Sequence, residues 1–317
     1  MLKKIDDYPA FLESCWQEHL QPKPDNAPTV ISTFAGAGGS SLGYSMAGFR
    51  ELLAVEWDDN AVETFRLNFP DVPVYHGDIA KLSVEQCLDI AGLQPGELDI
   101  FDGSPPCQGF STAGKRQLDD PRNQLFREYV RLLQGLKPKV FIMENVSGMV
   151  KGLMKLVFVE ILKELKASGY RVSARLLNAM YFGVPQSRER MIFVGVRDDL
   201  GIEPSHPKAW SVPVAAIRLD EKRANYSDVR YGDQIVKKGK PVNTVARLQR
   251  HFWDRHNELG ESSYQVCGSF PLAYKFIGSF QDKKNRIGNS VPPLMMRSIA
   301  RHIRQEILDK HNANSTL

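Results

Sequence analysis

Short runs of apolar and β-branched residues alternate with longer segments in which apolar positions recur every three or four residues. The short runs indicate buried strands, and the longer segments indicate amphipathic helices. Strands separated by helices are typical of βαβ units, so we predict an α/β fold with a doubly wound, mostly parallel, Rossmann-like sheet. The predicted strands cover residues 29–34, 51–56, 72–75, 98–101, 140–143, 171–177 and 191–196.

The strand–helix alternation stops after Arg197. The sequence that follows is rich in basic and aromatic residues and has few long periodic stretches, which is typical of a smaller, irregular second domain. We therefore expect an N-terminal extension, a large α/β domain, a smaller irregular domain and a C-terminal segment that returns to the large domain. These parts cover residues 1–28, 29–197, 198–280 and 281–317.

Two further helices are predicted near the ends of the chain. The N-terminal extension places Phe11, Leu12, Trp16 and Leu20 at helical spacing, and we expect this helix to pack on the large domain. A proline-rich linker separates it from the first predicted strand. The second helix runs from Pro293 to Leu308, and we expect it to pack back on the large domain as well.

Composition narrows the class of protein. The chain has 317 residues, of which 42% are hydrophobic, enough for one large core or a large and a small domain. No apolar run reaches the roughly 18 residues of a membrane span, and the N-terminus lacks the apolar centre of a secretion signal. Four cysteines without framework spacing agree with a reducing compartment. We therefore expect a cytoplasmic protein.

The distribution of charge is a weaker indication of nucleic-acid binding. The net charge of +4 does not diagnose nucleic-acid binding, but residues 206–285 contain 14 Lys or Arg against 8 Asp or Glu. A basic surplus of this kind suits a surface that contacts phosphates. A mixed, solvated face would show the same surplus, so charge alone leaves both interpretations open.

A single cysteine stands where a ligand-binding loop is expected. Cys107 follows the strand 98–101 closely, and open α/β sheets keep their ligands at the carboxyl ends of strands. Most lone cysteines are small buried hydrophobes, but prolines precede this one and polar residues follow it. Cys15, Cys87 and Cys267 lie too far away in sequence for a metal or disulfide pattern, and we expect no metal site. The pattern favours a nucleophile.

A glycine-rich turn follows the first predicted strand. Gly36, Gly38 and Gly39 let a ligand approach the backbone closely, and Glu56 lies at the end of the second strand, where a carboxylate can accept ribose hydroxyls. The neighbouring Trp57 offers a face for a purine, and Asp78 after the third strand can accept from an adenine amino group. NAD fits this layout almost as well as S-adenosylmethionine.

Five motifs occur in a fixed order over about 260 residues. They are Phe34-Ala-Gly-Ala-Gly-Gly39, Pro106-Cys107-Gln108, Glu144-Asn-Val146, Gln186-Ser-Arg-Glu-Arg190 and Gly288-Asn-Ser-Val-Pro-Pro293. Together they resemble the ordered motif set of the C5-cytosine DNA methyltransferases. The resemblance implies a methyltransferase of the Rossmann-like class that uses S-adenosyl-L-methionine and acts on DNA.

The resemblance assigns a cofactor site and shows one departure. By similarity, the cofactor-binding residues are Phe34, Gly36, Gly38, Gly39, Glu56, Trp57, Asp78, Ile79, Pro105, Leu125, Asn289, Ser290 and Val291. The family often has an acid two residues before the motif's Phe. Ser32 occupies that position here, which puts the usual contact with the cofactor's amino group in doubt.

The resemblance also assigns the chemistry. Cytosine C5 is a weak nucleophile until a thiolate adds at C6, and Cys107 suits that role. Glu144 is the candidate acid near N3, while Arg188 and Arg190, placed on one face of the seventh strand, hold the cytosine and its nucleotide. The resemblance leaves open which group removes the C5 proton, and an ordered water serves as well as a side chain.

The target cytosine has to leave the duplex to reach Cys107, so base flipping is expected, with residues 109–122 closing over the base. Pro106, Gln108, Ser111, Asn145 and Val146 are the substrate-binding candidates.

The resemblance implies that residues 29–197 are the catalytic domain and residues 198–280 the target-recognition domain, in which specificity is expected to reside. Residues 240–245 loosely match the motif that should precede the last one, and Arg247, Gln249 or Arg250 can reach base edges.

The sequence favours a monomeric DNA (cytosine-5)-methyltransferase acting on double-stranded DNA, in a bacterial restriction-modification system with a cognate restriction endonuclease. One rival is a tRNA cytosine-5 methyltransferase, although this sequence lacks the Cys-Phe-Thr tripeptide of that branch. A catalytically silent DNA-binding relative is the other rival, and the intact motifs argue against it.

Overall fold

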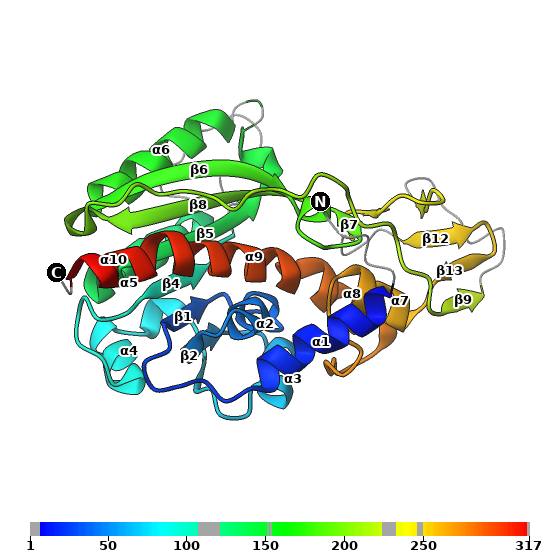
Figure 1. Ribbon diagram of the computed structural model, residues 1–317, viewed down its shortest axis with the longest axis horizontal. Coiled ribbons are helices and arrows are strands. Elements are labelled where there is room, and N and C mark those ends of the chain that lie inside the picture. The colour runs from blue at the N-terminus through cyan, green and yellow to red at the C-terminus, as the bar shows by residue number, and fades with distance from the viewer. Residues whose placement is uncertain are drawn as a thin grey trace.

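The computed structural model describes residues 7–106, 121–150, 152, 154–223, 233–245 and 250–315. Within them, a seven-stranded sheet has the order β3-β2-β1-β4-β5-β8-β6 (Figure 1). Neighbouring strands are parallel except that β8 is antiparallel to both β5 and β6, which confirms the predicted mostly parallel sheet. The strands are β1 Thr29–Thr33, β2 Arg50–Glu56, β3 Val74–His76, β4 Ile100–Gly103, β5 Val140–Val146, β6 Tyr170–Asn178 and β8 Glu189–Arg197.

Helices cover both faces of this sheet, because successive residues of each central strand point to opposite sides. In β1, Val30 packs into the core beneath α2 and α9, whereas Ile31 packs into the core beneath α4, α5 and α6. In β4, Ile100 packs into the same core as Val30, and Phe101 packs into the same core as Ile31. The sheet is therefore doubly wound, as predicted. The helices before and within it are α1 Tyr8–Leu20, α2 Gly39–Met46, α3 Asp59–Asn68, α4 Val84–Ala91, α5 Pro121–Leu136 and α6 Met154–Ala167.

A smaller sheet projects beyond one end of the large one (Figure 1). Its order is β10-β12-β13-β9, and a separate two-stranded sheet pairs β11 with β7. Because β7 leads directly into β8 of the large sheet, the β11–β7 pairing joins the large sheet to the residues around the smaller sheet, which we call the small unit. The strands are β7 Gln186–Ser187, β9 Glu221–Arg223, β10 Gln234–Ile235, β11 Val242–Asn243, β12 His251–Asp254 and β13 Asn257–Leu259.

Both chain ends pack on the large sheet. The predicted helix 293–308 is present as α9 Pro293–Ile303 followed by a π-helical turn Arg304–Leu308, and it continues as α10 Asp309–Ser315. Before it lie α7 Glu261–Cys267 and α8 Phe280–Asn289. Helix α1 packs as expected, with Leu12 and Cys15 buried and Glu18 paired with Arg297. Leu20, expected on its apolar face, is 53% exposed because the helix ends there.

Helix α2 lies unusually close to the C-terminal segment because two of its residues lack a side chain. A Cβ atom on Gly39 would lie 2.3 Å from the Val291 carbonyl oxygen. One turn later, a Cβ on Gly43 would lie 2.6 Å from both Met296 Cβ and the Pro293 carbonyl oxygen. Real Cβ atoms do not approach backbone this closely, so both glycines are required by packing.

We expect Gly43→Ala to lower the free energy of unfolding by about 1–3 kcal/mol, because an extra methyl in a filled contact forces the helices apart. Chemical denaturation measures the change. Gly148→Ala is the control, since its Cβ would meet nothing within 4 Å. Equal stability of the two variants would show that α9 can retreat without cost.

Candidate functional site

The carboxyl ends of β1, β2, β4 and β5 meet at one edge of the large sheet, where α/β proteins place their ligands. The chain leaves β1 into the glycine-rich turn and leaves β4 into Ser104, Pro105 and Pro106. Glu56 ends β2, while Glu144 lies in β5 two residues before the strand ends, slightly earlier than the sequence indicated. Three of the five motifs and Glu56 therefore reach the same edge.

The glycine-rich turn is held in a left-handed conformation. Phe34 and Gly36 both have φ of 55°, and Gly38 has φ of 80°. A Cβ on Gly36 would meet nothing within 4 Å, so this residue faces open space, whereas a Cβ on Gly38 would lie 2.7 Å from Phe69. The Tyr274 hydroxyl donates to the Ala37 carbonyl and fixes the far side of the turn.

Glu56 organises the backbone around this turn. Its carboxylate is 9% exposed and accepts from three backbone N–H groups, those of Gly36 at 2.8 Å, Trp57 at 2.9 Å and Asp58 at 3.0 Å. A carboxylate has about four acceptor positions, so about one remains for a ligand hydroxyl. The side chain therefore both shapes the turn and presents an acceptor to it.

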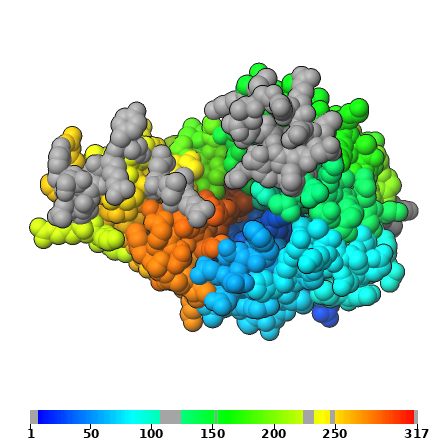
Figure 2. Space-filling view, turned by 180° about the vertical axis from the view of Figure 1, so that it is seen from behind, coloured from blue at the N-terminus to red at the C-terminus, as the bar shows by residue number. Residues whose placement is uncertain are grey.

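A pocket opens between the turn and the C-terminal segment. Figure 2 shows a hollow where the blue surface of the N-terminal part meets light-blue and orange surfaces. The pocket is lined by Phe34, Ala35, Gly36, Ala37, Ser40, Ser104, Arg286, Asn289, Ser290 and Val291. Five of these are predicted cofactor residues, and they come from the first and last motifs. Sequence reasoning missed Ser40, Ser104 and Arg286, although Ser40 directly follows the glycines.

Other predicted cofactor residues lie away from this lining. Trp57 is 78% exposed, which leaves its ring face accessible for stacking. Asp78 is exposed and accepts from the Ala80 N–H, capping a short 3-10 helix that contains the buried Ile79. Leu125 on α5 is half-buried and Pro105 is buried. Their assignment to the cofactor stays a prediction.

The Glu144 and Arg190 side chains form a partly enclosed ion pair. Arg190 Nε lies 2.6 Å from Glu144 Oε1, and the two side chains are 12% and 11% exposed. Arg190 reaches Glu144 because Val146 of β5 pairs with Arg190 of β8 in the antiparallel register. Bidentate-capable guanidinium groups hold carboxylates in a fixed orientation. The pair thus presents an oriented carboxyl at the edge of the sheet.

Asn145 ties this edge to the predicted nucleophile loop. Its Nδ2 donates to the Pro105 carbonyl at 2.9 Å, and its Oδ1 accepts from the Val146 N–H. Val146 itself is 52% exposed. Pro106 is exposed and is the last described residue before a gap. Cys107, Gln108, Ser111, Arg247 and Gln249 lie outside the described residues, so their placement stays a prediction.

Arg188 is buried and connects three parts of the chain. The side chain precedes β8 rather than lying in it, and the residue is 2% exposed. Its guanidinium donates to the Val245 carbonyl at 3.2 Å and the Ser290 carbonyl at 3.0 Å. Burial lowers the pKa of Arg188, and the neighbouring Arg190 lowers it further. Arg188 thus anchors the small unit and the last motif to this edge of the large sheet.

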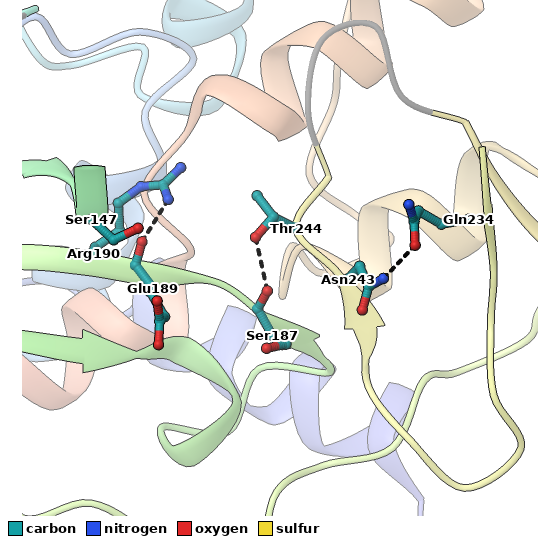
Figure 3. Close-up of a pocket in the computed structure, with 7 residues that line it drawn as sticks. All are labelled: Ser147, Ser187, Glu189, Arg190, Gln234, Asn243 and Thr244. Carbon is teal, nitrogen blue, oxygen red and sulfur yellow. Dashed lines mark hydrogen bonds between the residues drawn. The ribbon is translucent and has the colours of Figure 1, made fainter. Parts of the chain in front are cut away.

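A second, polar pocket of about 420 Å³ lies between this edge and the small sheet. Its lining residues are Ser147, Ser187, Glu189, Arg190, Gln234, Asn243 and Thr244. Figure 3 shows Ser147, Glu189 and Arg190 on one side, the Gln234–Asn243 pair on the other, and Ser187 and Thr244 between them. Asn243 and Thr244 belong to the predicted segment 240–245, which therefore borders this edge of the large sheet.

Three comparisons identify relatives. The profile of the family described as C-5 cytosine-specific DNA methylase matches residues 28–268. The chain is 33% identical to the Type II methyltransferase M1.HphI of Haemophilus parahaemolyticus, covering 86% of this chain and 85% of that protein. It is 40% identical to the Type II methyltransferase M.FnuDI of Fusobacterium nucleatum, covering 89% and 95%.

The fold resembles a solved structure. A prophage-encoded E. coli protein, described as a DNA modification methyltransferase, superposes with a TM-score of 0.74 at 22% identity, over 89% of this chain and 100% of that one. Among the described residues, no helix is long and apolar enough to cross a bilayer.

We expect Arg188→Lys to lower the free energy of unfolding by about 1–3 kcal/mol, because an ammonium cannot reach both buried carbonyl groups. Thermal or chemical unfolding measures the loss. Arg171→Lys serves as the control, since Arg171 pairs with the exposed Glu203 and should change stability by less than about 0.5 kcal/mol. A loss for Arg188→Lys no larger than that of the control would remove its anchoring role.

Proposed function

The chain belongs to the C-5 cytosine-specific DNA methylase family, and from this premise we propose that it methylates C5 of cytosine at a specific sequence in double-stranded DNA, with S-adenosylmethionine as donor. The observation that carries the proposal is the convergence of the first and last motifs in one pocket, at the same edge of the sheet as the Glu144–Arg190 pair. The relatives named Type II methyltransferases support a place in a restriction-modification system.

The residues of the first pocket fit S-adenosylmethionine. When bound, the cofactor supplies a methyl group that its sulfonium makes electrophilic. The remaining acceptor position of Glu56 suits a ribose hydroxyl, and the open space at Gly36 admits the ligand against the backbone. Asn289, Ser290 and Val291 close the pocket from the opposite side.

Cys107 is the nucleophile in this proposal, and the other thiols are poor candidates. Cys15, Cys87 and Cys267 are all buried, and burial raises the pKa of Cys87 to about 11 and of Cys267 to about 12. Such thiols stay protonated and unreactive at neutral pH. Cys107 follows the exposed Pro106 at the edge where Asn145 holds the Pro105 carbonyl.

Glu144 supplies the acid. Addition of the thiolate at C6 places electron density on the cytosine ring, and a proton held at Glu144 and shared with N3 stabilises it. Arg190 fixes the carboxyl orientation through its 2.6 Å contact, and the remaining N–H groups of Arg190 border the polar pocket. Removal of the C5 proton then expels Cys107, and water is the base we propose.

The polar pocket is the proposed entrance for the DNA. Its volume of about 420 Å³ and its polar lining suit a nucleotide rotated out of the duplex, since a stacked base cannot reach Cys107. Arg190 and Ser147 offer donors for the nucleotide, and the Thr244 hydroxyl, which donates to the Ser187 carbonyl, offers an acceptor (Figure 3). We also propose that the protein is cytoplasmic and monomeric, and that a cognate restriction endonuclease is its partner in the cell.

We expect the protein to transfer labelled methyl from S-adenosylmethionine to unmethylated duplex DNA as 5-methylcytosine, and Cys107→Ser to abolish transfer while retaining cofactor binding. Unmodified tRNA is assayed in parallel. Label in tRNA alone would move the protein to the RNA-modifying branch. Label in neither substrate would favour a silent DNA-binding relative.

We expect Glu144→Gln to reduce the methyl-transfer rate by about 10²–10³-fold, because the amide cannot give a proton to N3. Single-turnover kinetics with saturating DNA measures the chemical step separately from binding. Glu160→Gln, an exposed change on α6, is the control. A Glu144→Gln enzyme with the control's rate would exclude the acid role.

A further inference from the structure

Two carboxyl side chains are buried between the large sheet and helix α2, and the proposed mechanism uses neither. Glu51 lies in β2 and Asp102 lies in β4, on either side of β1. Asp102 is 3% exposed, and Glu51 Oε2 is buried with no hydrogen-bond partner among the described residues. Buried carboxyls are costly unless they are protonated or hydrogen-bonded, so this pair requires an explanation.

Helix α2 supplies hydroxyl groups to both carboxyls. Asp102 Oδ1 accepts from the Tyr44 hydroxyl at 3.1 Å, and the Ser40 hydroxyl acts on Asp102 to lower its pKa. Ser41 donates to Glu51 Oε1 at 2.9 Å. Successive serines of one helix thus face different acids, Ser40 toward Asp102 and Ser41 toward Glu51.

Only one of the two acids is connected to the cofactor pocket. Ser40 lines that pocket, and so does Ser104, which lies two residues after Asp102. Ser41, the partner of Glu51, is fully buried and does not line it. A charge that enters the pocket is therefore one hydroxyl away from Asp102.

The surroundings of Asp102 favour its neutral form. Burial raises the pKa of Asp102 to about 7, and the charge of Glu144 on β5 raises it further, against the hydrogen bonds from Tyr44 and Ser40. Glu51 on β2 and Tyr129 on α5 also interact with it electrostatically. Burial likewise raises the pKa of Glu51, to about 8. Near neutral pH both carboxyls hold protons for part or most of the time.

We propose that Asp102, which lies behind Ser40 and outside the pocket lining, releases its proton to solvent when S-adenosylmethionine enters the pocket. This inference rests on the proposed function. The carboxylic O–H bond breaks, the proton passes to the buffer, and the carboxylate keeps the hydrogen bond from Tyr44 and the favourable interaction with the Ser40 hydroxyl. The cofactor carries one net positive charge from its sulfonium, ammonium and carboxylate groups, and a nearby cation stabilises a carboxylate.

Cofactor affinity should depend on pH because cofactor binding and deprotonation of Asp102 are thermodynamically linked. A cation in the pocket lowers the pKa of Asp102, so the complex binds fewer protons than the free protein. Cofactor affinity is therefore full above the pKa of the free protein and is lost as the pH falls below it. With that pKa at about 7, affinity at pH 6 should be about tenfold weaker than at pH 8.

Isothermal titration calorimetry of the full chain in two buffers with different ionisation enthalpies tests this directly. At pH 7 the wild type should release about half a proton on binding S-adenosylmethionine, because Asp102 is about half protonated there. S-adenosylhomocysteine, which lacks the sulfonium charge, should release less. Asp102→Asn should bind with no proton release and a flat pH profile, whereas the matched variant Glu51→Gln should keep the release.

The outcomes separate this inference from the proposed function. Binding without proton exchange in the wild type, or equal release with both ligands, would overturn the role of Asp102, and these two measurements need no variant. Release that persists in Asp102→Asn, or disappears in Glu51→Gln, would also overturn it. Absence of any S-adenosylmethionine binding would instead overturn the proposed function, and the inference with it.

Discussion

The close contact between helix α2 and the C-terminal segment is the constraint on which the rest of the site depends. Ser290 and Val291 lie far along the sequence from α2, the first helix after β1. They and the start of α9 can contact α2 only because Gly39 and Gly43 carry no Cβ. The contact places the last motif against the glycine-rich turn. The pocket between them therefore exists only in the fully folded protein.

Other interactions reinforce this contact from different directions. Tyr274 donates to the Ala37 carbonyl in the turn, and Arg286 pairs with Asp58 just after β2 at 2.7 Å. Arg188 joins the Ser290 carbonyl to the Val245 carbonyl of the small unit. The same segment thus closes the proposed cofactor pocket and fixes one wall of the polar pocket. This arrangement links the cofactor site mechanically to the surface proposed to receive DNA.

Much of the fold could be predicted from sequence because buried strands and amphipathic helices leave periodic patterns. The convergence of motifs followed from the rule that parallel strands share a carboxyl edge. The direction of β8 left no such signal, since an antiparallel buried strand has the same apolar run as a parallel one. The domain boundaries and the roles of the residues outside the described ranges stay predictions.

The parts of the site that sequence reasoning missed depend on three-dimensional neighbours. The sequence predicts that Arg188 holds the cytosine, but it does not reveal that the guanidinium also donates to two backbone carbonyls from distant segments. Asp102 and Glu51 sit in apolar strands, where single acids do not reveal that both will face α2. Ser40 gained significance only when its place in the pocket lining was known.

Covalent trapping shows whether Cys107 attacks cytosine C6 at this edge of the sheet. Duplex DNA with 5-fluorocytosine at the target position should accept the methyl group and then stall, because fluorine cannot leave C5 as a proton does. We expect a stable protein–DNA adduct that forms only with S-adenosylmethionine and that maps by mass spectrometry to the peptide containing Cys107. An adduct at another residue, or turnover of this DNA without any adduct, would contradict it.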